Sequence, residues 1–334
     1  MSDTKRLAFV FLLLGLVLSG CGASLNKEDE TELGTETIAE IELPTATMAE
    51  PTIPPEPTEA VFVPGTHWIS QVDGMEMVYI PGGEFSMGWT GMDATIVNGP
   101  GPTADFMEFV ASVEEFWIDK YEVSNGQYQQ CVAAGACRPC NQNNIPPQGK
   151  DYFMDPVYAD YPVVNVSWYM ARDYCAWAER RLPTEAEWEK AARGTDARKY
   201  PWGNENYSDT YANMCDKDCP TSVRGEHGNP NFDDGFPGPA PVGSFPAGAS
   251  PYGVLDMAGN VWEWTATAEK PYPYNATDGR ESEYDIEDGS KWPERILRGG
   301  PWNDGYAYMR SSFRYRAVAI YWNFNMGFRC AYSE

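Results

Sequence analysis

The sequence predicts a loop-rich fold with short strands and only a few helices. Glycine and proline together account for 58 of the 334 residues (31 plus 27), and many of them lie after residue 65. Both residue types interrupt regular secondary structure. Apolar runs of alternating pattern are short, whereas three segments carry clear helix-capping residues. The roughly 270 residues that follow exceed a typical domain length without requiring a second domain.

Residues 1–21 have the features of a bacterial lipoprotein signal peptide. Lys5 and Arg6 precede an apolar run over residues 7–18, which is too short to span a bilayer but suits a signal-peptide core. Leu18-Ser19-Gly20-Cys21 matches the lipobox, in which the cysteine is lipidated. We therefore expect a lipid anchor on Cys21 and an extracytoplasmic protein of the bacterial cell envelope. Ordinary secretion, with Cys21 incidental, is the alternative.

Residues 22–64 are expected to form a disordered tether. They consist mainly of Thr, Glu, Pro and Ala, with hardly any aromatic residue. Such a segment cannot bury enough apolar surface to offset its chain entropy. The folded domain is therefore expected over residues 65–334.

The charge balance argues against nucleic acid as a partner. The formal net charge is −25 and the isoelectric point is about 4.4, whereas binding to phosphates requires a basic face. Seven arginines nevertheless lie between Arg280 and Arg329. They form either a local basic patch or scattered internal salt bridges, and their spacing does not decide between the two.

Capping residues predict the first two helices. Ser124 begins a segment in which Tyr128, Cys131 and Val132 share one face, and Gly135 ends it. Ser167 begins the second helix, which is predicted by apolar residues at helical spacing. These residues are Trp168, Ala171, Cys175 and Ala178.

A capping box predicts the third helix. Thr184 and Glu187 follow Pro183, and Gly194 ends the segment. This box accounts for the acidic run without a catalytic role for Glu185, Glu187 or Glu189. Strand patterns are weaker, and the better candidates are residues 75–80 and 163–168.

The stretch PYGVLDMAGNVWEWT, residues 251–265, contains a candidate metal site. Asp256 and Glu263 are seven residues apart, with Gly259 between them. Glycine permits the positive-φ turns that direct carbonyl groups inward. Ca²⁺ prefers oxygen ligands from carboxylates and carbonyls, which Asp256, Glu263 and the carbonyls of Gly259 and Val261 could supply. The alternative is an ordinary Gly-Asn turn beside a buried tryptophan strand.

The same stretch resembles the signature of the formylglycine-generating-enzyme family, also called sulfatase-modifying factors. The resemblance implies a compact α/β domain related to the C-type lectin fold, with little regular structure. Other blocks agree and occur in family order from about residue 70 to the last residues. They are MVYIPGGEFSMG (77–88), YEVSNGQY (121–128), PVVNVSW (162–168), RRLPTEAEWEKAARG (180–194), PWGN (201–204), RGG (298–300) and GFRCA (327–331).

The resemblance also implies a second calcium site. Its ligands would be the Asn213 side chain, the Met214 carbonyl, Asp234 and the Phe236 carbonyl. Two bound ions would cross-link the loops and would be structural rather than catalytic. The alternative is a pair of polar surface loops without an ion.

Seven cysteines besides Cys21 favour disulfides in an exported chain. The resemblance implies the pair Cys175 and Cys330, whose long loop would contribute about 3 to 5 kcal/mol in the chain-entropy model. Cys215 and Cys219 are close enough for a local bridge. The pairing of the remaining three stays open, and a CxxC zinc site is the alternative for two of them. The three are Cys131, Cys137 and Cys140.

The catalytic part of the resemblance fails. Active members of the family oxidise a substrate cysteine with copper held by two cysteines, but residues 298–317 contain none. The aligned positions are Asn303 or Asp304, and Ser312, while Pro301 replaces a serine. Oxygen ligands cannot replace thiolates in holding Cu(I), so copper and formylglycine generation are not expected. The histidines His67 and His227 are too few for the iron site of other branches.

The leading interpretation is therefore a lipid-anchored domain that binds a protein, peptide or glycan. The competing class is a protein-modifying oxidoreductase with altered chemistry in the same cleft. Aromatic and arginine side chains would supply the contacts. For the five candidates, core packing and internal ion pairs are the alternative. They are Trp262, Trp302, Arg310, Arg314 and Arg316.

Overall fold

The computed structural model describes residues 62–89, 107–140, 145–149, 151–225, 228–282 and 293–334. All structural statements below concern these ranges. The expected signal peptide, the lipidation site Cys21 and nearly all of the expected tether lie outside them. Within the described ranges, no helix is both long and apolar enough to cross a membrane.

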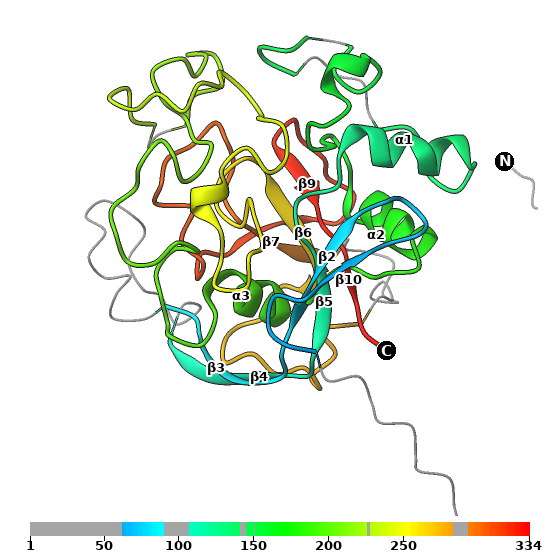
Figure 1. Cartoon of the computed structure of the whole chain (residues 1–334), viewed down its shortest axis with the longest axis vertical. Helices are drawn as coiled ribbons and strands as arrows, with labels where there is room; N and C mark the ends of the chain where they lie inside the picture. Colours follow the sequence, from blue (N-terminus) through cyan, green and yellow to red (C-terminus); the bar gives the residue numbers. More distant parts are fainter. Residues whose placement is uncertain (1–61, 90–106, 141–144, 150, 226–227, 283–292) are drawn as a thin grey trace, which may run out of the picture. The chain divides into compact units, whose positions relative to one another are not determined.

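One four-stranded antiparallel sheet joins early strands of the domain to its last one. The strand order is β1 (His67–Ile69), β2 (Glu76–Ile80), β5 (Phe116–Asp119) and β10 (Ala331–Tyr332). Strand β10 lies beside β5 (Figure 1). Ala331 pairs with Ile118, which sets the register between the two strands. The predicted strand over residues 75–80 is thus present as β2.

A second four-stranded sheet contains the GNVWEWT stretch. Its order is β8 (Tyr315–Val318), β7 (Glu294–Arg298), β6 (Trp262–Ala268) and β9 (Met326–Phe328), with β6 and β9 parallel. A separate antiparallel pair is formed by β3 (Gly83–Met87) and β4 (Phe109–Val113). Two 3-10 turns, Pro156–Tyr158 and Pro246–Gly248, lie in the connecting loops.

The three predicted helices are present with the predicted caps. They are α1 (Asn125–Ala133), α2 (Trp168–Trp177) and α3 (Glu185–Arg193). The hydroxyl groups of Ser124, Ser167 and Thr184 each accept a hydrogen bond from the backbone N–H three residues later. This satisfies an N–H group that the helix itself leaves unpaired.

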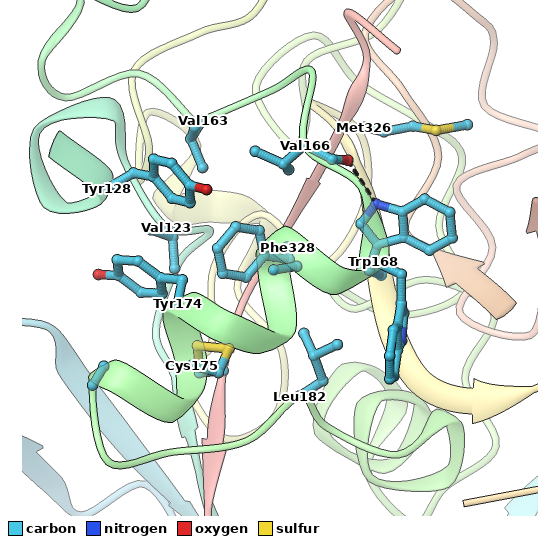
Figure 2. Packing of buried hydrophobic residues seen from close by; sticks show 14 of the residues in the cluster. Val123, Tyr128, Val163, Val166, Trp168, Tyr174, Cys175, Leu182, Met326 and Phe328 are labelled. Carbon is cyan, nitrogen blue, oxygen red and sulfur yellow. Dashed lines mark hydrogen bonds between the residues drawn. A yellow bond between two sulfur atoms is a disulfide. The ribbon is translucent and has the colours of Figure 1, made fainter. Parts of the chain in front are cut away.

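The main hydrophobic core lies where α2 packs on β6 and β9 (Figure 2). Trp168 and Trp264 are fully buried and are fixed by reciprocal hydrogen bonds. The Trp168 indole donates to the Thr265 carbonyl (2.8 Å), and the Trp264 indole donates to the Val166 carbonyl (3.0 Å). These bonds satisfy the polar atom of each buried indole while its rings fill the core.

The prediction of a strand over residues 163–168 is wrong. Its valines are buried, as a strand interpretation requires, but the backbone is irregular up to the start of α2. Asn165 has a positive φ of 60°, which interrupts an extended conformation. The Val163 and Asn165 amides donate to the carbonyls of Val123 and Asn323 instead of to one neighbouring strand.

Three disulfides link distant and local segments. Cys175 of α2 bonds to Cys330, and Cys215 bonds to Cys219, as the sequence led us to expect. Of the three cysteines whose pairing the sequence left open, Cys131 and Cys137 form a disulfide. Because Cys137 is oxidised, the alternative zinc site with Cys140 does not form.

Candidate functional site

The segment that would carry the family's catalytic cysteines is part of the packed interior. Ser312 is fully buried, and the Asp304 carbonyl accepts a hydrogen bond from the Cys215 amide (2.9 Å). The Asn303 carbonyl accepts one from the Gly225 amide (2.7 Å). A Cβ atom on Gly225 would lie 2.4 Å from the Asp304 carboxyl group, so a side chain at this position would displace that carboxyl group.

No pair of free thiols exists in the described part of the chain. Six of its seven cysteines form disulfides, and the seventh, Cys140, is buried. Burial raises the pKa of the Cys140 thiol to about 12, so the reactive thiolate is scarce near neutral pH. The described residues include one histidine, His67, whose Nδ1 lies 2.5 Å from a Glu76 oxygen.

Four of the five expected cleft residues are buried and do not form a contact surface. Trp302 packs against Phe324 with ring centroids 5.8 Å apart, beside the Cys215–Cys219 bond. The Arg310 guanidinium lies 3.8 Å from the centre of the Trp89 ring. Trp262 is buried as well, and Arg316 alone of the five is exposed. The burial of these four residues favours the alternative of core packing and internal ion pairs over direct ligand contact.

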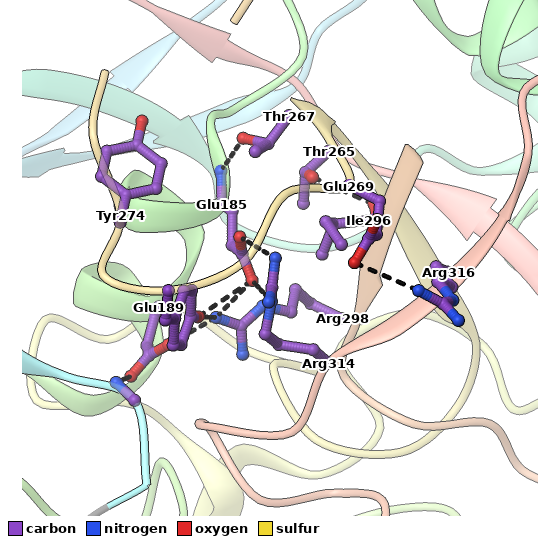
Figure 3. A network of polar contacts seen from close by, with 12 residues as sticks. Glu185, Glu189, Thr265, Thr267, Glu269, Tyr274, Ile296, Arg298, Arg314 and Arg316 are labelled. Atoms are coloured by element: carbon purple, nitrogen blue, oxygen red, sulfur yellow. Dashed lines mark hydrogen bonds and ion pairs between the residues drawn. The ribbon is translucent and has the colours of Figure 1, made fainter. Parts of the chain in front are cut away.

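Arg314 belongs to a buried ionic network (Figure 3). Its Nε atom lies 2.5 Å from a Glu185 oxygen, and Arg298 lies 3.2 Å from the same oxygen. Arg298 also pairs with Glu189, which in turn pairs with Arg193 at 2.7 Å. Burial alone would raise the pKa of Glu185, but Arg314 and Arg298 hold it below its usual value. The network ties α3 to β7 and β8.

The arginine-rich end of the chain does not form a basic patch. Of the seven arginines from Arg280 to Arg329, six are buried. Arg316 is exposed and lies 3.1 Å from Glu269 and 3.6 Å from Glu294. The alternative of internal salt bridges is therefore correct for most of this group.

The candidate calcium site of Asn213 and Asp234 has a donor set that fits the ion. Asn213 Oδ1 is buried and has no hydrogen-bond partner within the described ranges. The amide nitrogen of Asn213 donates to the Gly238 carbonyl (2.9 Å) and to Asn260 Oδ1 (3.1 Å), which fixes the orientation of the side chain. An orphaned buried oxygen is costly unless a cation or water compensates it.

Asp234 is held against the residue that follows Asn213 in the sequence. Its carboxylate accepts hydrogen bonds from the amides of Met214 (2.8 Å) and Phe236 (2.9 Å). Burial raises the pKa of Asp234 to about 7, a sign that the carboxylate lacks a neighbouring positive charge. Gly259 is required here, since a Cβ would lie 2.2 Å from the Asn213 carbonyl and its φ is +83°. Asn213, Asp234 and the two expected carbonyls would hold Ca²⁺.

The candidate site of Asp256 and Glu263 differs from the expectation. Glu263 already binds Arg329 through two hydrogen bonds (2.6 and 2.7 Å) and accepts another from the Trp188 indole (2.8 Å). Asp256, at a φ of 57°, accepts from the Gly243 amide (2.5 Å). Gly259 and Val261, whose carbonyls were expected as ligands, are buried in the turn between the two acids.

Sequence reasoning missed Glu122, which is buried beside Asp256. Neither Glu122 carboxylate oxygen has a hydrogen-bond partner among the residues described. Burial, followed by Asp256 and Glu263, raises the pKa of Glu122 well above its usual value. With Glu122 protonated, the carboxylates of Asp256 and Glu263 face the single guanidinium of Arg329. No three acidic, histidine or cysteine side chains of the described ranges converge as around a bound metal, so this set is the weaker calcium candidate.

The fold and the site define a loop-rich, disulfide-linked α/β domain of the C-type lectin-related kind. The profile of the sulfatase-modifying factor enzyme 1-like domain matches residues 68–334. The chain belongs to this family, that of the formylglycine-generating enzymes.

Individual relatives differ in their chemistry. The chain is 31% identical over 308 residues to the inactive C-alpha-formylglycine-generating enzyme 2 of Bos taurus, covering 79% of this chain and 91% of that protein. It is 41% identical over 165 residues to the hercynine oxygenase of Mycobacterium tuberculosis, covering 48% of this chain and 34% of that protein. The structure of PvdO from Pseudomonas aeruginosa superposes with a TM-score of 0.61 and 27% identity, covering 81% of this chain and 99% of that one.

Proposed function

We propose that this chain is a lipid-anchored, extracytoplasmic binding module that uses the formylglycine-generating-enzyme fold without the family's thiol-based oxidation. The carrying observation is the state of the cysteines, since the described residues offer no two thiolates to a copper ion. A relative that bears the word "inactive" in its name and spans most of this chain supports the same interpretation. The ligand would be a protein, a peptide or a glycan.

Tyr315 offers the contact surface, and a cluster of aromatic side chains supports it. We call this cluster the Tyr315 platform. It consists of Trp262, Tyr308, Phe313 and Tyr315. Tyr315 is 43% exposed and stacks on buried Trp262, with centroids 5.1 Å apart and planes inclined by 20°. Tyr308 and Phe313 pack edge to face at 4.8 Å. A rigidly held aromatic face binds peptide and sugar surfaces at a small entropic cost.

Arg316 extends this surface with a charged group. Its side chain is 58% exposed. Its neighbour Glu269 directly follows the last residue of β6, and its neighbour Glu294 is the first residue of β7. An exposed guanidinium can form paired hydrogen bonds with carboxylates of a ligand. Of the five binding residues expected from the sequence, two therefore remain in the proposal. Trp262 supports Tyr315, and Arg316 contacts the ligand.

Replacing Tyr315 by alanine is expected to weaken ligand binding by about 30-fold, since truncation of a central aromatic contact costs about 2 kcal/mol or more. The measurement is binding of the purified protein to peptide and glycan arrays, with titration of the best ligand. Val110→Ala on β4, at a position 69% exposed, is the matched control and should leave binding unchanged. If the Tyr315 and Val110 variants bound the ligand with equal affinity, the Tyr315 platform would not be the binding surface.

An oxygen-consumption assay distinguishes this proposal from the enzyme alternative. The purified protein should neither consume oxygen with a thiol peptide nor convert peptide cysteine to formylglycine. Consumption together with a stoichiometric bound metal would establish an oxidoreductase with altered chemistry instead.

The anchor is tested separately from the binding site. Mass spectrometry of the mature protein is expected to show an acylated N-terminal Cys21, because the lipobox directs lipidation of that residue. A mature N-terminus without acyl chains would contradict anchoring while leaving the binding proposal intact.

A further inference from the structure

A second concave site lies apart from the residues discussed so far. It is a pocket of about 870 Å³ between the β4–β5 turn, the first turn of α3 and residues 274–281. None of its lining residues belongs to the calcium candidates, to the Tyr315 platform or to the segment 298–317. Its volume falls within the range of small-molecule sites.

The charge of the pocket is strongly negative. Five glutamates and one arginine line it. Arg181 is already neutralised by Glu187, to which it donates two hydrogen bonds (2.7 and 2.6 Å). The formal charge of the lining is thus −5 + 1 = −4. The remaining four carboxylates are those of Glu114, Glu115, Glu281 and Glu334.

Aromatic rings form the walls between these carboxylates. Phe62 and Tyr79 pack against Trp117, with ring centroids 5.0 and 5.4 Å apart. Two of the phenols hold the acids in place, since the Tyr79 hydroxyl donates to Glu115 (2.6 Å) and the Tyr274 hydroxyl donates to Glu281 (2.7 Å). Aromatic faces attract organic cations, and this attraction adds to that of the carboxylates.

Glu281 is the most enclosed of the four acids. Hydroxyl groups of Thr267 and Tyr274 donate to it, and within the described residues it forms no salt bridge. Burial raises its pKa to about 7, and the negative charges of Glu185 and Glu187 act in the same direction.

We propose that this pocket binds an organic polycation whose primary ammonium groups lie against the aromatic walls and pair with the glutamates. A metal ion does not fit, since no three acidic side chains of the described ranges converge closely enough to hold one. A free polyamine and a lysine-rich peptide share the required chemistry. The proposal is independent of the Tyr315 platform.

Binding of a cation favours the ionised form of Glu281 and releases its proton. The charged and titratable groups around it are Glu185 and Glu187 of α3, Arg181, which pairs with Glu187, and Tyr274. A positive ligand therefore binds more tightly above the pKa of the free carboxyl group. Affinity is expected to rise several-fold between about pH 6 and about pH 8.

Isothermal titration of the full-length protein in detergent tests the site with spermidine and with a trilysine peptide, each at matched ionic strength. Glu281→Gln is expected to weaken binding about tenfold and to flatten the pH dependence. Glu114→Gln, on the exposed turn, is a second variant in case Glu281→Gln disturbs folding, and Glu205→Gln at an exposed site elsewhere is the matched control.

Binding of both probes supports recognition of the shared ammonium chemistry, and binding of one alone identifies the source. Two results overturn the proposal. One is no heat of binding with either probe at about 1 mM. The other is binding that Glu281→Gln and Glu114→Gln reduce no more than Glu205→Gln does.

Discussion

Replacing Arg298 by methionine is expected to lower the free energy of unfolding by about 3–5 kcal/mol, the usual cost of removing one partner of a buried ion pair. Arg298 is fully buried and pairs with both Glu185 and Glu189. It also donates to the carbonyls of Ser311 (2.8 Å) and Phe313 (3.0 Å). Methionine would fill much of the volume but would leave these acceptors without their donor.

Arg316→Met provides the matched control for this loss. Arg316 lies on the adjacent strand β8 and also contacts two glutamates, but it is exposed to solvent. An exposed pair contributes about 0–1 kcal/mol, so this variant should unfold almost as the wild type does. Denaturant titration of both variants measures the difference. Comparable losses in the two would show that the Arg298 network contributes no more than a surface pair.

Removal of calcium is expected to lower the stability of the domain by about 3–4 kcal/mol per site when free calcium is 100 to 1,000 times the dissociation constant. The physical reason is that the proposed ion would bind the folded state, where it would satisfy Asn213 Oδ1 and the Asp234 carboxylate. Addition of a chelator should therefore lower the melting temperature. Inductively coupled plasma mass spectrometry must confirm that the metal has been removed.

Asn213→Ala is the informative variant for this prediction. It removes the unpaired oxygen, so the difference in melting temperature with and without chelator should shrink. Glu263→Gln is a poorer choice, because it weakens the pair with Arg329 whether or not a metal is present. An unchanged melting curve of the wild type after verified metal removal would rule out structural calcium.

The helices could be predicted from the sequence because their determinants are local. Ser124, Ser167 and Thr184 each act on an amide three residues away, and Gly194 ends α3 with a φ of 67°. The loop-rich character likewise follows from glycine and proline content. The class of fold was predicted from the sequence motifs shared with the family, because periodicity alone does not indicate it.

The role of the arginines could not be predicted, since their partners are far away in the sequence. Arg314 pairs with Glu185 across 129 residues, and Arg329 with Glu263 across 66. Without these partners in view, a charged residue is expected at the surface. Glu122 was missed for the same reason, although it lies in the YEVSNGQY block that carried part of the resemblance.

Residues 326–332 are needed to complete both four-stranded sheets. Residues 326–332 supply β9, the Arg329 partner of Glu263, the Cys330 partner of Cys175, and β10. Until they are in place, β5 and β6 each lack a neighbouring strand. Contacts between residues so distant in sequence also form slowly. A molecule in which residues 326–332 have not yet docked is therefore almost complete but open, and chaperones or proteases can act on it.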